Sequence, residues 1–131
     1  MKKEIVVVGA VITDGQLVLC AQRGADMALP GMWEFPGGKL EQDETDQQAL
    51  VREIAEELEC EIQVGERITT TRHEYDFGFV TLTTYYATVT TGTPVTTEHA
   101  ELRWVEASNL DSLEWAPADI PAIELIKKNL A

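Results

Sequence analysis

The sequence predicts an α+β layer sandwich, and three observations support this fold class. Runs of β-forming residues occur near the beginning and in the middle of the chain, an acidic amphipathic segment lies between them, and the chain ends in a second helical pattern. A length of 131 residues suffices for one hydrophobic core, and we find no internal repeat or linker-like tract. We therefore expect a single domain that comprises residues 1–131.

The first part of the chain is predicted to form a β-hairpin followed by a loop. Residues 5–13 and 17–22 read as strands, and Asp14-Gly15 between them is typical of a hairpin turn. Residues 24–32 are rich in Gly, Pro and Met and are expected to form a loop. A short extended segment is expected at residues 33–35.

A helix is predicted to begin after Thr45. Thr45 and Gln48 have the spacing of a capping box, in which each side chain accepts a hydrogen bond from the backbone N–H of the other residue. Apolar residues then recur at helical spacing, which predicts that one face packs against a core: Ala49, Leu50, Ile54 and Leu58.

The rest of the chain is predicted to contain three strands and a second helix. Residues 61–71 alternate weakly, residues 79–90 are rich in Thr, Val and Tyr, and residues 102–105 read as a last strand. Residues 117–130 are expected to begin with a turn and to continue as a helix. The apolar stripe of this helix is predicted to be Ile120, Ile123, Ile126 and Leu130.

The first helix carries three glutamates within one turn. Glu53, Glu56 and Glu57 stand at i, i+3 and i+4, so their like charges repel unless a cation lies among them. Carboxylate oxygens are the ligands that Mg²⁺ prefers. The alternative is an acidic, solvated helix face. However, residues 41–61 contain many acids and a single base, Arg52, whereas a surface helix selected only for stability would mix the signs.

Pro36-Gly37-Gly38 shortly precedes this helix. The tripeptide cannot be regular helix, and glycine lets backbone groups approach a metal or a phosphate closely. In isolation it would indicate an ordinary turn between a strand and a loop. Its position before an acidic, capped helix favours a shared pocket.

Residues 37–60 resemble the Nudix box, the signature of the Nudix hydrolases, and residues 33–36 resemble the MutT branch of that family. The residues that carry the box, at the family's spacings, are Gly38, Glu44, Arg52, Glu53, Glu56 and Glu57. The resemblance implies a Nudix-type α/β/α sandwich with a mixed β-sheet between helices. It also implies hydrolysis of nucleoside triphosphates to the monophosphate and pyrophosphate, in nucleotide-pool cleansing and DNA repair.

The resemblance further implies a magnesium site. Glu53, Glu56 and Glu57, with the carbonyl of Gly37, would hold Mg²⁺ or a substituting Mn²⁺, and Glu53 would be either a ligand or the general base. Glu98 stands where the MutT branch keeps another carboxylate that acts on metal or water. From the residues alone, an exposed loop glutamate explains Glu98 equally well.

Other residues of this region are expected to support the carboxylates. Arg52 and Glu44 would orient them. The box normally ends in glycine, and this chain has Glu59 there, followed by Cys60. That glycine usually supplies a left-handed helix end, so Glu59 is expected to cost about 1 kcal/mol or to end the helix differently. His73 and His99 show no ligand spacing and no nucleophile partner, so no role is assigned to them.

A formal net charge of −13 argues against a nucleic-acid partner, because an acidic surface repels the phosphate backbone. A triphosphate must therefore be bound locally, by the metal and by nearby bases. Arg23 and Lys39 are the candidates, although both would also be unremarkable as surface residues. Glu34, Phe35 and Gly38 complete the nucleotide-binding residues that the resemblance implies.

Asp119 stands where MutT-like enzymes place the side chain that reads the base. The 8-oxoguanine-specific enzyme has asparagine there, and residues 116–121, Ala-Pro-Ala-Asp-Ile-Pro, are closer to relatives that act on cytidine nucleotides. An ionised aspartate only accepts hydrogen bonds, which suits the N4 amino group of cytosine, and the same acceptor could meet N7–H of 8-oxoguanine. Alternatively, Asp119 caps the terminal helix, with Pro121 in its first turn.

We therefore expect (d)CTP or a modified cytidine nucleotide as substrate, with 8-oxo-dGTP as the alternative. Phe35, Phe77 and Phe79 are either base-stacking or core residues. A nucleotide-sensing Nudix-like domain without activity is a further alternative, but such domains usually lose box carboxylates. Relatives that cleave a nucleotide sugar such as ADP-ribose typically carry a proline soon after the box, and none occurs between Cys60 and Thr93.

The cysteines and the N-terminal segment bear on the compartment. Cys20 and Cys60 lie in apolar stretches without zinc spacing, which indicates buried free thiols in a reducing environment. The apolar run at residues 5–8 is short, follows Glu4 and lacks a cleavage site, so a strand explains it better than a signal peptide. We expect a cytoplasmic protein with no membrane span, as a monomer or homodimer.

Overall fold

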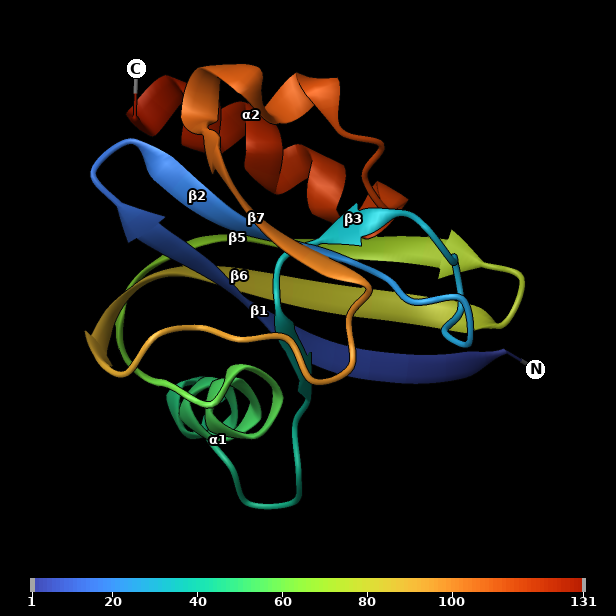
Figure 1. Ribbon diagram of the computed structural model, residues 1–131. Coiled ribbons are helices and arrows are strands. Elements are labelled where there is room, and N and C mark those ends of the chain that lie inside the picture. The colour runs from blue at the N-terminus through green and yellow to red at the C-terminus, as the bar shows by residue number, and fades with distance from the viewer. Residues whose placement is uncertain (1, 131) are drawn as a thin grey trace.

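The computed structural model describes residues 2–130, which form a mixed β-sheet with helices on both faces (Figure 1). The strands are β1 (Lys3–Asp14), β2 (Leu17–Gln22), β3 (Trp33–Glu34), β4 (Gly37–Lys39), β5 (Glu61–Tyr75), β6 (Gly78–Thr91) and β7 (Glu101–Glu106). The α-helices are α1 (Asp46–Leu58) and α2 (Ile120–Asn129), and the 3₁₀ helices are η1 (Ala107–Ser112) and η2 (Pro117–Asp119).

Strand β1 is the centre of the sheet. The strand order is β3-β2-β1-β6-β5, with β4 also paired to β1 and β7 to β2. β1 and β6 run parallel from the pair Lys3 and Gly78 to the pair Ile12 and Ala87, whereas the other strand pairs are antiparallel. The predicted mixed sheet between helices is therefore confirmed.

The two faces of the sheet bury separate apolar clusters. Helix α1 covers one face, and η1 with α2 covers the other (Figure 1). The α1 side includes all four residues predicted for its buried face, each fully buried: Ala49, Leu50, Ile54 and Leu58. The α2 side includes Trp33, Phe35, Leu110, Trp115, Ala122, Ile123 and Ile126.

One residue of the predicted α2 stripe lies outside the core. Ile120 is 47% exposed, whereas Ile123 and Ile126 are buried as predicted. Ala122 takes a place in the buried face. Because a helix turns about 100° per residue, a face centred on Ala122, Ile123 and Ile126 leaves Ile120 to one side.

Both ends of α1 follow the sequence closely. Thr45 Oγ1 accepts from the Gln48 N–H at 3.1 Å and Gln48 Oε1 accepts from the Thr45 N–H at 3.0 Å, so the predicted capping box is present. Glu59 ends the helix in the left-handed conformation, with φ 56° and ψ 38°. The chain thus keeps the helix end that glycine usually supplies and accepts the backbone strain of a side chain there.

Several elements differ from the sequence prediction. β5 continues to Tyr75, and register shifts between Val64 and Arg67 and between Arg67 and Thr69 explain its weak alternation. β4 was not predicted, since two glycines give no apolar period. The short helix η1 was also missed.

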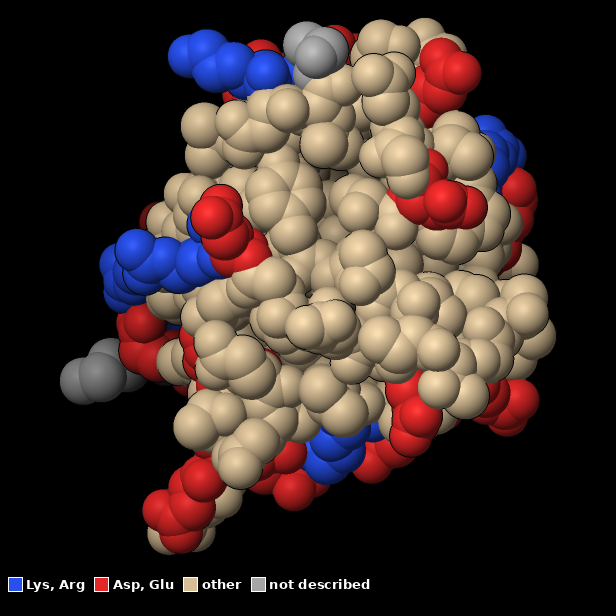
Figure 2. Space-filling model, turned by 90° about the vertical axis from the view of Figure 1, so that its left-hand side faces the viewer, with Lys and Arg blue, Asp and Glu red and all other residues tan. Residues whose placement is uncertain are grey.

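Charged side chains surround an uncharged area on one face of the molecule. On the face shown in Figure 2, acidic and basic side chains lie around a broad uncharged area, and the Lys and Arg atoms visible there form no continuous basic surface. Within residues 2–130, no helix is both long enough and apolar enough to cross a bilayer.

Candidate active site

A cavity of about 420 Å³ gathers most of the residues predicted for the site. It lies against the β3–β4 segment, the C-terminal part of α1, the loop before β7 and η2. The predicted residues that line it are Arg23, Glu34, Phe35, Gly37, Gly38, Lys39, Glu57, Glu98 and Asp119. Glu44, Arg52, Glu53 and Glu56 are not among the lining residues.

The two glycines allow β4 and α1 to approach each other. Gly37 pairs with Gly9 of β1, and a Cβ on Gly37 would overlap the carbonyl oxygen of Val8. A Cβ on Gly38 would overlap the carboxylate of Glu53. Gly37 therefore allows β4 to pair closely with β1, and Gly38 leaves room for the carboxylate of Glu53 on α1.

Arg52 holds the carboxylates on the outer side of α1. Its Nε lies 2.6 Å and its Nη2 2.9 Å from the two oxygens of Glu44, and its Nη1 donates to Glu53 at 2.8 Å. Nη2 also donates to the Lys39 carbonyl at 3.1 Å. The Arg52 hydrogen bonds lower the pKa of Glu44 to about 2. Arg52 thus ties α1 to β4 and to the preceding loop.

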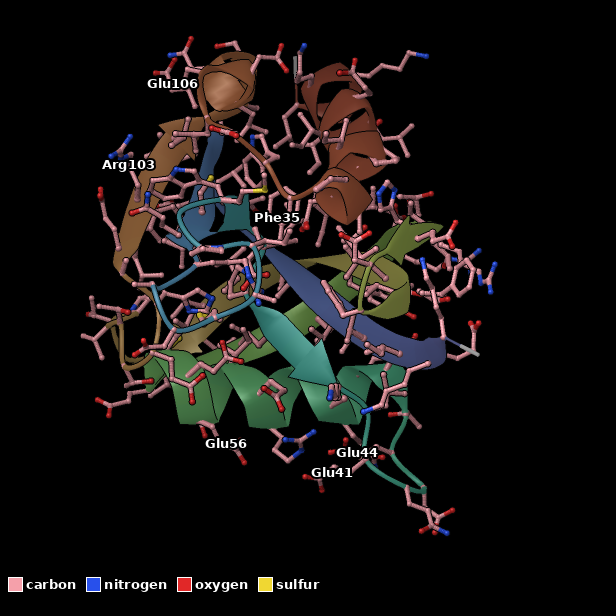
Figure 3. The ribbon with its side chains drawn as sticks, turned by 90° about the vertical axis from the view of Figure 1, so that its right-hand side faces the viewer. Phe35, Glu41, Glu44, Glu56, Arg103 and Glu106 are labelled. Atoms are coloured by element: carbon pink, nitrogen blue, oxygen red, sulfur yellow. The ribbon has the colours of Figure 1, made fainter. Side chains whose placement is uncertain are left out.

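Glu57 is the buried carboxyl of the cluster, with 7% of the residue exposed. Burial raises the pKa of Glu57 well above its usual range, and the hydrogen bond and charge of Glu53 and the charges of Glu98 and Glu34 raise it further. Several acidic groups therefore face one small volume. Glu56 differs: its side chain is 61% exposed and projects outward from α1 (Figure 3).

Glu34 and Arg23 form an ion pair beside the cavity. Arg23 Nη1 lies 2.6 Å from Glu34 Oε1, and both side chains are largely buried. Arg23 Nε also donates to the Ala28 carbonyl. Lys39, in contrast, is exposed. The two bases predicted to bind phosphate therefore line the cavity, and Arg23 is held in place by Glu34.

Asp119 lies at the opposite end of the chain but at the same cavity. Its Oδ1 accepts from the Phe35 N–H at 3.1 Å, and its side chain makes no capping hydrogen bond to α2. Burial and the charge of Glu34 raise the pKa of Asp119 well above its usual value. The carboxyl of Asp119 therefore keeps its proton, and with it an O–H donor, to a higher pH than a free aspartate does.

The three phenylalanines have different environments. Phe35 is 4% exposed and its ring centroid lies 4.7 Å from that of Trp115, so its side chain belongs to the core while its N–H binds Asp119. Phe77 is 46% exposed and stacks on Tyr75, and both line the cavity. Phe79 lies under the guanidinium of Arg72.

Comparison with known proteins shows which family the chain belongs to. The NUDIX domain family matches residues 7–125. The chain belongs to the Nudix family. The predictions of the Nudix box and of a Nudix hydrolase are therefore confirmed, and residues 33–60 supplied the signal.

Relatives of known name cover almost the whole chain. It is 40% identical over 122 residues to a CTP pyrophosphohydrolase of Escherichia coli K12, covering 93% of this chain and 90% of the relative. It is 30% identical over 128 residues to an 8-oxo-dGTP diphosphatase of the same strain, covering 98% and 99%. A solved structure of MutT, a Nudix hydrolase from methicillin-resistant Staphylococcus aureus 252, is 53% identical with a TM-score of 0.81, covering 98% and 99%.

Nudix hydrolases generally use divalent metals, and the donor chemistry of this cavity fits such an ion. Glu57 and Glu98 line the cavity and Glu53 borders Glu57; carboxylate oxygens are the hard donors that such an ion prefers, and the repulsion among these carboxyls favours a cation near them. Within the described residues, no group of three or more Asp, Glu, His or Cys side chains is arranged so that it could hold a metal ion.

His99 was missed by the sequence analysis. Its side chain is 2% exposed, its Nε2 lies 2.8 Å from Glu34 Oε2, and its Nδ1 lies 3.8 Å from Glu57 Oε2. Its only sequence signal is its position after Glu98 and before a strand. A contact with Glu34 across 65 residues cannot be read from local spacing.

The two glycines give a paired prediction. Gly37→Ala is expected to destabilise the protein by about 3 kcal/mol, because the new Cβ meets the rigid backbone of β1. Gly38→Ala meets only the flexible end of Glu53, so stability should fall little while metal-dependent turnover falls about 10- to 100-fold. Denaturant unfolding and turnover assays measure both effects.

Gly65→Ala, whose Cβ would lie 3.4 Å from the Tyr86 oxygen, is the control for a glycine in a strand. Equal effects of the first two changes would contradict these roles.

Proposed function

We propose that this single-domain Nudix hydrolase cleaves (deoxy)nucleoside triphosphates to the monophosphate and pyrophosphate with Mg²⁺, and that (d)CTP or a modified cytidine nucleotide is preferred. The carrying observation is the cavity itself. It brings the box carboxyl Glu57 to the same pocket as Asp119, the residue proposed to read the base. Known relatives named for CTP and for 8-oxo-dGTP support this substrate class.

Glu53, Glu56, Glu57 and Glu98, with the Gly37 carbonyl, are the proposed ligands of the metal. A bound Mg²⁺ would neutralise phosphate charge and polarise the attacking water. Glu56 is exposed, lies 3.5 Å from Arg52 Nη1 and does not line the cavity, so as a ligand it would have to leave Arg52 and turn toward the ion. Mn²⁺ is expected to substitute, because it accepts the same oxygen ligands.

The chain's own groups are proposed to orient the reactants. Arg52 and Glu44 hold Glu53, which is a ligand or the general base that takes the water proton. Arg23, held by Glu34, and Lys39 are proposed to bind the phosphates. Water attack breaks one phosphoanhydride bond and releases pyrophosphate.

The preference for cytidine depends on Asp119. Its Oδ1 is occupied by the Phe35 N–H, so the second oxygen remains to meet the base. When that oxygen is an acceptor it suits the N4 amino group of cytosine. The second candidate, 8-oxo-dGTP, is favoured by the 8-oxo-dGTP diphosphatase relative and by the same acceptor meeting N7–H.

A substrate panel tests this proposal. We expect pyrophosphate release from dCTP or CTP at the highest kcat/KM, loss of turnover with EDTA, and recovery with Mg²⁺ or Mn²⁺. The panel includes 8-oxo-dGTP, dGTP, dUTP and ADP-ribose, with separate detection of phosphate, pyrophosphate and the nucleoside monophosphate. Release of phosphate alone would indicate cleavage of a different bond. No cleavage of any nucleotide would refute the proposal.

A further inference from the structure

His99 is a buried polar residue for which the proposed catalytic scheme has no use. Its side chain is almost fully enclosed, yet Nδ1 has no hydrogen-bond partner among residues 2–130. A core histidine normally satisfies both ring nitrogens, because a buried polar atom without a partner is unfavourable. The Nδ1 atom lies nearest to a site carboxyl, at 3.8 Å from Glu57 Oε2.

The other ring nitrogen fixes the orientation of the imidazole. Nε2 lies 2.8 Å from Glu34 Oε2, and because a carboxylate can only accept, Nε2–H is the donor. Glu34 is in turn paired with Arg23 at 2.6 Å. The chain of contacts therefore runs from Arg23 through Glu34 to His99, and ends facing Glu57.

The backbone around His99 is anchored on both sides of the cavity. Thr97 Oγ1 donates to the Glu57 carbonyl at 2.8 Å, and the Ala100 N–H donates to the Gln22 carbonyl at 2.8 Å. Thr96 Oγ1 donates to the His99 carbonyl at 2.7 Å. The loop is thus tied both to α1 and to β2, so the ring is held between the two halves of the site. A movement of about 1 Å would bring Nδ1 to hydrogen-bond distance from Glu57.

We propose that His99 is a positioning residue that links the nucleotide-binding pair Arg23 and Glu34 to the metal-binding carboxyl of Glu57. Nε2–H sets the position of Glu34, and Nδ1 engages Glu57 when the site is loaded. Because a metal-bound carboxylate only accepts, this contact requires the doubly protonated ring, in which both nitrogens are donors. The imidazole thereby fixes the position of the phosphate-binding pair relative to the metal-binding carboxyl. This inference rests on the proposed function, because it takes Glu57 as a metal ligand.

Two substitutions separate the nitrogens. The amide of glutamine takes the place of Nε2, and the amide of asparagine takes the place of Nδ1. His99→Gln is expected to keep KM for the nucleotide within a few-fold and to weaken Mg²⁺ binding by the nucleotide-free protein about tenfold or more. His99→Asn is expected to keep Mg²⁺ binding and to raise KM, because Glu34 loses its contact with Nε2 and is then held by Arg23 alone.

The measurements are calorimetric titration with MgCl₂ alone, kcat and KM for the best nucleotide of the panel, and thermal unfolding. His73→Gln is the control, since His73 lies on β5 and does not line the cavity. If one variant fails to fold, the other still reports on its own nitrogen.

Distinct results would overturn this inference and the proposed function. Normal Mg²⁺ binding and KM in both variants, or equal losses that follow the loss of thermal stability, would make the imidazole a packing element and overturn the inference alone. A wild-type protein that binds Mg²⁺ but cleaves no nucleotide would refute the proposed function, and the Mg²⁺ titrations would still decide the role of Nδ1.

Discussion

Replacing Glu57 with glutamine is expected to reduce kcat/KM in Mg²⁺ about 10³-fold, the effect of losing several kcal/mol of metal-assisted stabilisation. Glutamine has the shape of a protonated glutamate, but it cannot supply an anionic ligand. Because burial favours the neutral form of Glu57 in the metal-free protein, the variant should fold with an unchanged or higher melting temperature. Pyrophosphate release and circular dichroism measure the two effects.

A neighbouring glutamate provides the control for this change. Glu59 is exposed, ends the same helix and is only two residues away, so Glu59→Gln should leave turnover unchanged. Activity of Glu57→Gln within tenfold of wild type would contradict the proposed role of Glu57. A loss of the folded state in Glu57→Gln would instead point to a structural role.

The raised pKa of Glu57 predicts how the stability of the metal-free protein depends on pH. The folded pKa of Glu57 is raised above its unfolded value of about 4.3, so the folded state binds more protons between these two values. Its contribution to stability is complete below the unfolded pKa and is lost as pH rises through the folded pKa. The free energy of unfolding should therefore fall with pH more steeply in wild type than in Glu57→Gln. Mg²⁺ should reduce the difference, and parallel curves without metal would contradict this account.

The parts of the site that sequence reasoning located are those encoded by local spacing. Thr45 and Gln48 predicted the start of α1, and the period of its apolar residues predicted which face is buried. The spacing of Glu53, Glu56 and Glu57 placed three carboxyls on one helix. It did not separate the buried Glu57 from the exposed Glu56, because the direction in which a residue faces depends on where the sheet and loops pack.

The parts of the site that the sequence did not predict depend on contacts between segments that are distant in the chain. The Asp119 carboxyl binds the Phe35 N–H across 84 residues, and His99 reaches Glu34 across 65. Such contacts arise from the order of strands in the sheet, which no single stretch of sequence encodes. The burial that raises the pKa of Asp119 also comes from contacts between distant segments, so the local sequence does not reveal it.

Replacing Asp119 with asparagine is expected to lower the ratio of kcat/KM for dCTP to that for 8-oxo-dGTP by about 10- to 100-fold, the discrimination that one well-placed base contact supplies. Asparagine can keep the hydrogen bond from the Phe35 N–H through its oxygen. Its amide then presents a donor where aspartate has a second oxygen; this donor disfavours the N4 amino group of cytosine, whereas in 8-oxoguanine it can donate to the acceptor O6 beside N7–H. Steady-state kinetics on both nucleotides measure the ratio. An equal loss on all bases would show that Asp119 acts only by holding the Phe35 backbone.

The pH dependence of base preference tests the same contact in the wild-type protein. Burial, followed by the charge of Glu34, raises the pKa of Asp119, so its free oxygen carries an O–H donor at lower pH and becomes an acceptor as pH rises through that pKa. Cytosine presents a donor at position 4 and uracil an acceptor. The ratio of kcat/KM for dCTP to that for dUTP should therefore rise with pH.

Steps common to both substrates, including any titration of Glu57, cancel in this ratio. The Asp119→Asn ratio should be independent of pH, because its amide does not titrate, and a wild-type ratio that falls with pH would mean that another group reads the base.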